Sequence, residues 1–213
     1  MPKLSVVVAV NSEVAFEELS GDSLLSLALT TANNFCIETS LKSQLYVAAQ
    51  NIAELRKATA GLNFKFQELR CNPSDPIELA AAVNDLDFEI IAIHDAQRPL
   101  TRGAQFHRTL EGLFGCDAVR PSMAFTETLK EINGDKLLTQ TIDRTKVRRI
   151  SSPEIIRRSV IDFEGTSSSW ALPLLDSARL SQVEADPESL RINSKDEITL
   201  MEAFLHWQQK IAK

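Results

Sequence analysis

The sequence predicts an α/β fold, in which an open and mostly parallel β-sheet carries helices on both faces and a β-hairpin arm protrudes. Short β-rich runs alternate with helix-like segments from residue 4 to residue 93, and repeated strand–helix–strand units imply a parallel sheet. Two runs, 6–8 and 90–93, are unbroken apolar sequences, which is typical of parallel strands buried on both faces. Asn133-Gly134 separates two more polar strand-like runs, and this dipeptide is the strongest local signal for a hairpin.

The elements of the first half follow in chain order. Strands are expected at residues 4–10, 45–49, 64–69 and 88–93. Helices are expected at residues 23–33, 52–59 and 77–84. Gly61 follows the second helix as a stop signal. Pro76 fits the first turn of the third helix, where its missing N–H costs no hydrogen bond.

The pattern changes in the second half, after about residue 122. The elements expected there are arm strands at residues 125–132 and 136–142, a helix that begins at Pro153 and extends to about residue 161, and a short strand at residues 191–193. Ser194 and Glu197 then form a capping box at the start of the last helix. We therefore expect one domain over residues 1–213, with residues 124–145 as the arm.

The composition fits a globular protein and disfavours two classes of partner. Of the 213 residues, 44% are hydrophobic and 24% are charged, which is enough apolar material to fill a core. The formal net charge is −6, whereas nucleic-acid-binding domains are usually basic, so no nucleic-acid partner is expected. No apolar run approaches the roughly eighteen residues of a membrane span, and the first residues lack a signal-peptide pattern. Cys36, Cys71 and Cys116 are dispersed, so we expect reduced thiols and a cytoplasmic protein without membrane contact.

Glycine is scarce, and this excludes two nucleotide-binding motifs. The chain has seven glycines, and no two of them are separated by a single residue. The dinucleotide-binding fingerprint G-x-G-x-x-G is therefore absent, and so is the P-loop G-x-x-x-x-G-K-[ST]. The sequence predicts no glycine-loop cofactor site, and its cysteines and histidines show no metal-ligand spacing.

Asp95 and Arg98 directly follow the buried strand that ends at residue 93. In an open parallel sheet, ligands bind beyond the carboxyl ends of the strands. An aspartate and an arginine three residues apart can there coordinate a cation and clamp an anion such as phosphate. The alternative is an Asp–Arg ion pair that organises a tight turn closed by Pro99.

Thr128 and Lys130 lie two residues apart on the first expected arm strand and therefore share one face of it. A hydroxyl and an ammonium group on one face suit a phosphorylated or polyol ligand. The alternative is an exposed strand that uses a β-branched residue and charges to avoid edge-to-edge pairing.

A basic stretch follows the arm. Residues 144–158 contain six basic residues and one acid, Glu154, which gives a local net charge of +5 in a chain of net charge −6. Arg144 opens this stretch, and Ser152 lies within it. The stretch could bind an anion. A solvated basic face or a contact between two subunits would explain the charge equally well.

Arg191 stands on the expected short strand that runs into the last helix. It could reach an anion at the edge of the sheet, or it could be an ordinary surface arginine. No nucleophile–base pair is predicted among the serine, cysteine and histidine residues, because nothing in the sequence places them together.

Taken in order, these motifs resemble those of the 2-C-methyl-D-erythritol 4-phosphate cytidylyltransferase family. HDAQRP at residues 94–99 is similar to the family's H-D-A-A-R-P, and TIDR at 141–144 is similar to its T-V-D-R. The weaker matches are ETLK at 127–130 to D-T-x-K, SSP at 151–153 to Q-T-P-Q, and RINSKDE at 191–197 to K-V-T-x-P-E-D. The motifs cover residues 88–213, whereas residues 1–87 resemble the family only in the order of their elements. The resemblance implies an open Rossmann-like nucleotidyltransferase sheet.

The resemblance also implies an activity and a set of site residues. The family transfers a cytidylyl group from CTP to a sugar-alcohol phosphate in isoprenoid precursor synthesis, and pyrophosphate leaves. By this resemblance the substrate-binding residues would be Asp95, Arg98, Thr128, Arg144 and Ser152. Arg191 would be the catalytic cation that stabilises charge at the α-phosphate. Mg²⁺ would be the cofactor of an active enzyme, and the arm would clasp a second subunit in a homodimer.

The nucleotide half of the family pattern is missing. The family's G-x-G-x-R-M loop and its lysine follow the first strand, where this chain has residues 11–20 without glycine. No Lys or Arg occurs in residues 4–41, and five acids give that span a net charge of −5, which opposes a triphosphate. The sequence leaves two functions open: a cytidylyltransferase with weak or lost CTP binding, or a catalytically inactive paralogue that binds a ligand or a partner. A transferase with another donor is disfavoured, because Asp85-Leu86-Asp87 has the D-x-D spacing but precedes a strand instead of following one.

Overall fold

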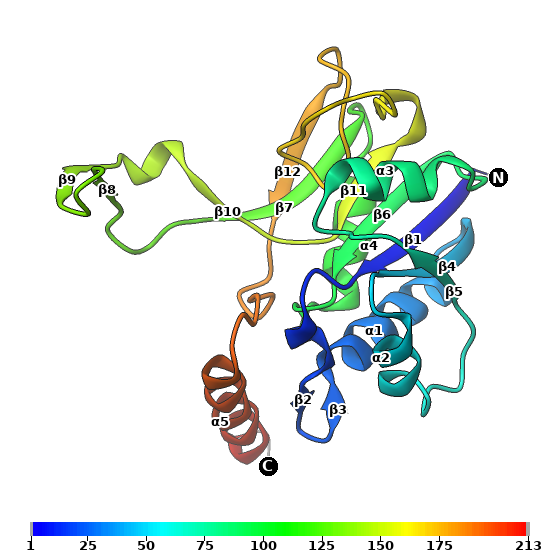
Figure 1. The fold of residues 1–213 in the computed structure, drawn as a ribbon, viewed down its shortest axis with the longest axis horizontal. Coiled ribbons are helices and arrows are strands. Elements are labelled where there is room, and N and C mark those ends of the chain that lie inside the picture. The colour runs from blue at the N-terminus through cyan, green and yellow to red at the C-terminus, as the bar shows by residue number, and fades with distance from the viewer. Residues whose placement is uncertain (1, 212–213) are drawn as a thin grey trace.

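The structure, a computed structural model, describes residues 2–211 and is built on one eight-stranded sheet. The strand order is β10-β7-β11-β6-β1-β4-β5, and β12 lies beside β7 (Figure 1). The parallel strands of the first half are β1 (Lys3–Ala9), β4 (Lys42–Ala49), β5 (Gln67–Arg70) and β6 (Ile90–Asp95). The open, mostly parallel α/β sheet is therefore confirmed. Residue 1 and residues 212–213, which the expected domain includes, lie outside the described residues.

Strand β1 is central in the parallel half and is buried on both faces. Val6 and Val8 pack into the hydrophobic core on one face of the sheet, and Val7 packs into a second core on the other face. All three side chains have no exposed surface. Because successive residues of a strand point to opposite faces, an unbroken apolar run is what a strand covered on both sides requires.

Helices cover both faces, as expected. The three that pack into the first core are α1 (Leu24–Glu38), α2 (Ile52–Ala58) and α4 (Gly103–Glu111). Helix α3 (Pro76–Asn84) packs into the second core. The helix starts follow the sequence signals, because Ser23, Asn51 and Asp75 each accept a hydrogen bond from a backbone N–H in the first turn. Helix α4 was not expected from the sequence.

The second half of the chain adds four strands to the sheet: β7 (Ala118–Ala124), β10 (Arg148–Ile150), β11 (Glu154–Arg157) and β12 (Leu180–Glu184). Strands β10 and β11 run antiparallel to their neighbours, whereas β12 pairs in parallel with β7. The helix expected at residues 153–161 is wrong, because residues 154–157 form β11 between β6 and β7. Ile155 packs into the first core and Ile156 into the second, so consecutive β-branched residues are buried on opposite faces. Beyond β11 a 3₁₀ turn (Arg158–Val160) is the only helical piece of that expected range.

Residues 191–193 do not form the expected strand. The Ile192 N–H donates to the Gln97 carbonyl at 2.8 Å in an irregular segment. The Gln97 side chain donates back to the Ile192 carbonyl at 2.6 Å, so the segment is tied to the loop after β6 without becoming a strand of the sheet.

The hairpin arm is present but shorter in its strands than expected. Strands β8 (Lys130–Ile132) and β9 (Leu138–Thr141) pair with each other and stand away from the body (Figure 1). The turn is longer than the expected two-residue Asn-Gly turn. The Asn133 side chain accepts from the N–H groups of Asp135 and Leu137, and Lys136 takes the left-handed conformation with φ of 61°. The asparagine therefore organises this turn, while the left-handed position falls on Lys136 instead of on the glycine.

A third, smaller core joins the segment after β1 to the last helix. The segment forms a 3₁₀ turn (Glu13–Phe16) and a short hairpin of β2 (Glu18–Leu19) and β3 (Asp22–Ser23). Helix α5 (Lys195–Ile211) packs on it through a cluster made of Leu19, Leu24, Ile192, Ile198 and Met201. The Ser194 hydroxyl accepts from the Glu197 N–H at 3.3 Å, in agreement with the expected capping box. Among the described residues, no helix is both long and apolar enough to cross a membrane.

Candidate functional site

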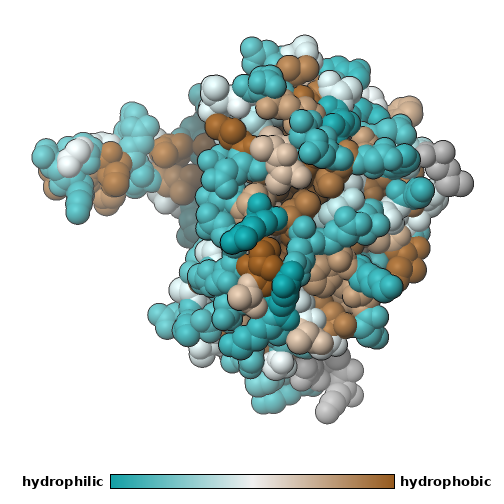
Figure 2. Space-filling model, turned by 45° about the vertical axis from the view of Figure 1, so that its right-hand side comes forward, coloured by the Kyte–Doolittle hydropathy of each residue, from teal (hydrophilic) through white to brown (hydrophobic). Residues whose placement is uncertain are grey.

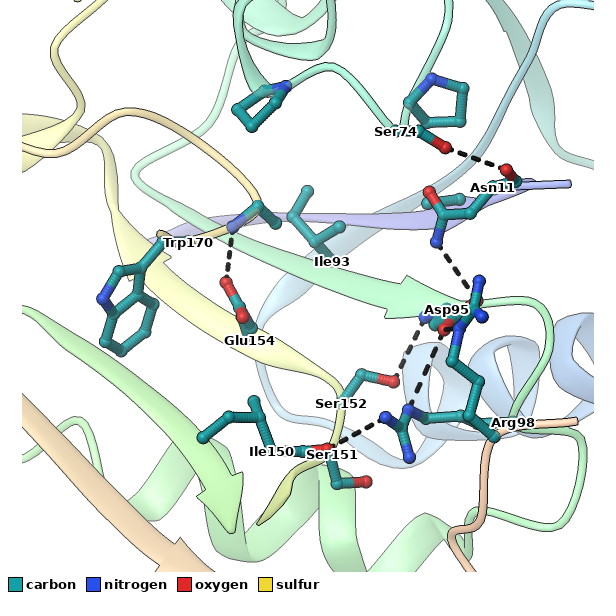
Figure 3. Close-up of a pocket in the computed structure, with 15 residues that line it drawn as sticks. Asn11, Ser74, Ile93, Asp95, Arg98, Ile150, Ser151, Ser152, Glu154 and Trp170 are labelled. Atoms are coloured by element: carbon teal, nitrogen blue, oxygen red, sulfur yellow. Dashed lines mark hydrogen bonds and ion pairs between the residues drawn. The ribbon is translucent and has the colours of Figure 1, made fainter. Parts of the chain in front are cut away.

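A cavity of about 370 Å³ opens beyond the carboxyl ends of β1 and β6 (Figure 3). Its wall comes from six parts of the chain: the end of β1, the loop before α3, the end of β6, the segment around β11, residues 170–171, and the segment before α5. The residues that carry the chemistry there are Asn11, Asp95, Arg98, Ser152, Glu154, Trp170 and Arg191. This is the edge of the sheet at which an α/β fold binds ligands.

Asp95, at the end of β6, lies at the centre of the polar wall. Its Oδ1 accepts from the Asn11 side-chain amide and from the Gln97 N–H, both at 3.1 Å. Its Oδ2 accepts from Arg191 Nε at 2.7 Å and lies 3.9 Å from Arg98 Nε. Both carboxylate oxygens are therefore occupied by protein donors. The carboxylate orients two arginines, which matches the ion-pair alternative of the sequence analysis.

Arg98 is held rigidly by two backbone carbonyls. Its Nη1 donates to the Ser189 carbonyl at 2.7 Å, and its Nη2 donates to the Ile150 carbonyl at 2.9 Å. Burial lowers the pKa of Arg98 and the nearby Asp95 carboxylate opposes that shift, but a guanidinium remains charged at neutral pH. Arg98 thus contributes a fixed positive charge, with its side chain only 13% exposed.

Ser152 connects the cavity wall to a buried histidine. Its hydroxyl accepts from the Asp95 N–H at 3.1 Å and shares a hydrogen bond of 2.9 Å with Nδ1 of His94. Burial lowers the pKa of His94 to about 4, so the ring is neutral at pH 7. The Ser152 hydroxyl is engaged inside the protein and fixes the end of β6.

Arg191 reaches the cavity from the irregular segment before α5. Besides its bond to Asp95, its Nη2 donates to Gln97 Oε1 at 2.6 Å, and its Nη1 donates to the Asn193 side chain. A guanidinium has five N–H donors, so two remain after these three bonds. Asp95, Arg98 and Arg191 together carry a net charge of +1 at the cavity wall.

Thr128 and Arg144 lie elsewhere. Both are exposed on the arm and neither lines the cavity of its own chain. Arg144 Nη1 donates to the Thr126 carbonyl at 2.7 Å, which holds the guanidinium against the arm itself. The structure therefore brings together Asp95, Arg98 and Ser152 with Arg191, and leaves the two arm residues apart from them (Figure 1).

Sequence reasoning missed the buried ion pair on the opposite wall. Glu154 Oε1 lies 3.1 Å from Arg120 Nη2, and its Oε2 accepts from the Ala171 N–H at 2.7 Å. The Arg120 guanidinium stacks 3.6 Å from the centre of the Trp170 ring. Burial raises the pKa of Glu154 and lowers that of Arg120, so desolvation outweighs their mutual attraction. No sequence signal marks this pair, because its members come from distant segments.

Gln97 was also missed, although a signal existed. Gln97 stands where the resembled motif H-D-A-A-R-P has its second alanine. A long polar side chain in place of alanine, directly after a buried strand, indicates that the amide has hydrogen-bond partners there. Its side chain is 1% exposed and bonds to Arg191 and to the Ile192 carbonyl.

The side of the cavity toward α3 carries no cation. There, the Ser74 hydroxyl donates to the Asn11 carbonyl at 2.8 Å, and Pro73 and Pro76 complete the wall. The acidic segment after β1 folds into the 3₁₀ turn and the β2–β3 hairpin, so no glycine loop stands beyond β1.

Comparisons with known proteins give the family. The family model described as IspD: 2-C-methyl-D-erythritol 4-phosphate cytidylyltransferase matches residues 72–206. The 2-C-methyl-D-erythritol 4-phosphate cytidylyltransferase of Caldanaerobacter subterraneus is 25% identical over 134 residues, which are 58% of this chain and 59% of that protein. The bifunctional enzyme IspD/IspF of Rhizorhabdus wittichii is 35% identical over 81 residues, or 38% of this chain and 21% of that protein. The chain thus spans less than two thirds of the length of these curated relatives.

Solved structures share the fold over nearly the whole chain. The 4-diphosphocytidyl-2C-methyl-D-erythritol synthase of Anaerococcus prevotii superposes with a TM-score of 0.78 at 16% identity, over 96% of this chain and 99% of that one. The 2-C-methyl-D-erythritol 4-phosphate cytidylyltransferase of Thermus thermophilus gives 0.73 at 17% identity, over 97% and 100% of the two chains. At sequence identities of 16% and 17%, these superpositions show a shared fold and nothing about activity. Because the family model covers well over half of the sequence, the chain belongs to the 2-C-methyl-D-erythritol 4-phosphate cytidylyltransferase family.

Proposed function

We propose that this protein binds a small sugar-alcohol phosphate in the cavity at the ends of β1 and β6 and transfers a cytidylyl group to it from CTP. In this reaction a phosphate oxygen of the sugar-alcohol phosphate attacks the α-phosphorus of CTP, the bond from that phosphorus to the bridging oxygen breaks, and pyrophosphate leaves. The observation that carries the proposal is the convergence of Asp95, Arg98 and Arg191 on one cavity in a chain of this family.

The electrostatics of the wall suit a phosphorylated ligand. Arg98 and Arg191 outweigh the Asp95 carboxylate between them, and the Glu154 carboxylate on the opposite wall is paired with Arg120. Arg191 keeps two N–H donors for phosphate oxygens. Charge that develops on the α-phosphate in the transition state is stabilised mainly by such fixed donors. We therefore assign to Arg191 the catalytic role, and to Asp95, Arg98 and Ser152 the positioning of the substrate end of the cavity.

The site would be completed by a second copy of the chain. Thr128 and Arg144 lie on the projecting arm, away from their own cavity, and would enter the cavity of a partner in a homodimer. The arm exposes apolar side chains that a partner would cover, seen as brown atoms on the projection in Figure 2. Ile132, Leu137 and Leu138 have exposed fractions of 66%, 62% and 71%.

Mg²⁺ would arrive with the triphosphate. Within residues 2–211 no group of three or more His, Cys, Asp and Glu side chains is placed to hold a metal, and Asp95 already binds protein donors through both oxygens. The ion would therefore neutralise the phosphates of CTP as part of the substrate.

We place the reaction in the cytoplasm, where the three free cysteines would stay reduced.

Binding of CTP is proposed to be weak, and this keeps a second function open. The segment after β1 carries Glu13 and Glu18 where a triphosphate would dock, and residues 4–41 contain no Lys or Arg. Glu17 of the same segment is paired with Lys195 of α5. Coulomb repulsion in that region favours an inactive paralogue that holds a phosphorylated ligand or a protein partner without turnover.

Pyrophosphate release separates the two functions. Purified protein is mixed with CTP, 2-C-methyl-D-erythritol 4-phosphate and Mg²⁺, and binding of the sugar phosphate alone is measured by calorimetry. We expect slow release that Arg191→Ala reduces by roughly 10²-fold or more, as for loss of a transition-state donor. The control is Arg179→Ala, an exposed arginine paired with Asp117 outside the cavity.

Three results are decisive. Turnover of about 1 per second, a common value for enzymes, would overturn the inactive-paralogue function. Binding of the sugar phosphate without any release would favour the inactive paralogue. An absence of both would overturn the proposed substrate.

A further inference from the structure

Gln97 lies at a junction of three chain segments that are distant in sequence. Its Oε1 accepts from the Ser12 hydroxyl at 2.9 Å and from Arg191 Nη2 at 2.6 Å, and its Nε2 donates to the Ile192 carbonyl at 2.6 Å. Its backbone N–H and carbonyl are also bonded, to Asp95 and to the Ile192 N–H. One buried side chain thus joins the segment after β1, the end of β6 and the segment before α5.

These bonds fix the orientation of the Gln97 amide. Flipping the amide would turn its NH₂ group toward the Arg191 guanidinium, which offers only donors, and its oxygen toward the Ile192 carbonyl. Both hydrogen bonds would be lost in a buried place where unpaired polar groups are costly. The oxygen therefore faces Arg191 permanently.

These bonds hold the Arg191 guanidinium along the edge formed by Nε and Nη2. Asp95 Oδ2 at the end of β6 accepts from Nε–H, and Gln97 Oε1, two residues later, accepts from Nη2–H. The third nitrogen, Nη1, donates to Asn193 of the same segment as Arg191. Arginine side chains carry about 2 kcal/mol of rotamer entropy when free. A guanidinium fixed in this way presents its remaining N–H donors in one direction, as anion recognition by preorganised donors requires.

We propose that Gln97 is a positioning residue that sets the orientation of Arg191 for a phosphoryl oxygen and couples it, through Ser12, to the segment after β1. An alanine at this position, as in the resembled motif, would make none of the three side-chain bonds. The identity of the anion rests on the proposed function, whereas the orientation of Arg191 does not.

Nitrogen-15 NMR of the arginine side chains tests the orientation without any ligand. In the wild-type protein the proposal requires separate, slowly exchanging Nη resonances for Arg191, assigned by their loss in Arg191→Lys. A single averaged Nη resonance in the wild type would overturn the proposal before any variant of Gln97 is made.

Three variants separate positioning from general loosening of the fold. Gln97→Met keeps the volume and removes the hydrogen bonds, so it should collapse the Arg191 Nη resonances into one. Gln97→Glu keeps an acceptor for Arg191 and should preserve them. Gln105→Met is the matched control for the resonances, because Gln105 is also fully buried and bonds to Asp186, Ser189 and the Ser152 carbonyl without touching Arg191. Unchanged resonances in Gln97→Met, or an equal collapse in Gln105→Met, would refute the assignment.

Binding of inorganic pyrophosphate, measured by calorimetry, then tests the anion. Loss of the fixed orientation in Gln97→Met should raise the Kd by about tenfold, the equivalent of about one charge-assisted hydrogen bond. An unchanged Kd would contradict the role of Gln97 in anion binding. If the wild type binds no pyrophosphate while its Arg191 resonances behave as described, the assignment of a phosphoryl anion to Arg191 fails and the positioning role of Gln97 stands.

Discussion

At the scale of single residues, the buried groups beside the cavity should make stability depend on pH. His94 has a folded-state pKa of about 4, because burial and the positive Arg98 outweigh the attraction of Asp95. The unfolded chain has the ordinary value near 6.5, so between these values the unfolded state binds more protons. The contribution of His94 to the free energy of unfolding is therefore fully present above pH 6.5, and it is lost as the pH falls toward 4.

The loss expected from His94 is about 3 kcal/mol across that window, because one pKa unit corresponds to about 1.4 kcal/mol. Urea unfolding at pH 7.0 and at pH 4.5 measures it. His94→Asn keeps an acceptor for the Ser152 hydroxyl and removes the titrating ring, so its stability should change less between the two pH values. An equal loss in the variant would assign the pH dependence to other groups.

The buried pair of Glu154 and Arg120 should be sensitive to loss of one partner. Glu154→Ala leaves the Arg120 guanidinium buried without its carboxylate, which costs about 3 kcal/mol or more. Urea unfolding checks this value. The control is Glu68→Ala at the surface pair with Arg56, where solvent replaces the lost partner and the effect should be much smaller. If Glu154→Ala and Glu68→Ala lowered the free energy of unfolding equally, the wall around Glu154 would be as well solvated as the surface.

The sequence located most residues of the candidate site but not their bonding. Asp95, Arg98, Ser152 and Arg191 were each named, and they share one cavity. Their roles as substrate-binding and catalytic residues stay predictions. The bonding of Gln97 could not be derived, because its partners at positions 12 and 191 approach only in the folded chain.

At the scale of elements, the parallel half was predicted well and the antiparallel half poorly. Strands β1, β4 and β6 each contain a continuous buried run, at residues 6–9, 45–49 and 90–93, and such runs signal burial on both faces by themselves. Strand β11 has only Ile155 and Ile156 between charged neighbours, and the proline before it equally suits a helix start. Strand β7 contains Pro121, which argues against a strand from local sequence alone.

The junction of α4 with the antiparallel strands depends on a glycine. A Cβ at Gly112 would lie 2.8 Å from Val183 and 3.1 Å from Val119, on β12 and β7. Gly112→Ala should therefore cost about 1–3 kcal/mol by overpacking. Gly61→Ala is the matched control, because a Cβ there meets nothing within 4 Å. Thermal denaturation of the two variants should separate them, and equal midpoints would mean that the valines move aside freely.

At the scale of the whole molecule, the arm should control the assembly state. Light scattering of the wild type should give twice the chain mass of 23.6 kDa if two copies exchange arms as proposed. Replacing Leu137 and Leu138 together by glutamate places charges in the expected contact and should shift the mass toward the monomer. Phe114→Glu is the control, at an apolar residue that is 97% exposed and lies outside the arm. A wild-type monomer at high concentration would contradict the dimer.

The third core has a consequence for the order in which the chain can fold during synthesis. Leu19 and Leu24 leave the ribosome before most of the sheet, whereas the residues that cover them, Ile192, Ile198 and Met201, emerge after its last strand, β12. The central sheet can begin to assemble in between, since β1, β4 and β6 all lie before residue 96. The segment after β1 must therefore wait with its apolar side chains uncovered while the strands of the sheet are made. It is the part of the nascent chain on which a chaperone would act longest.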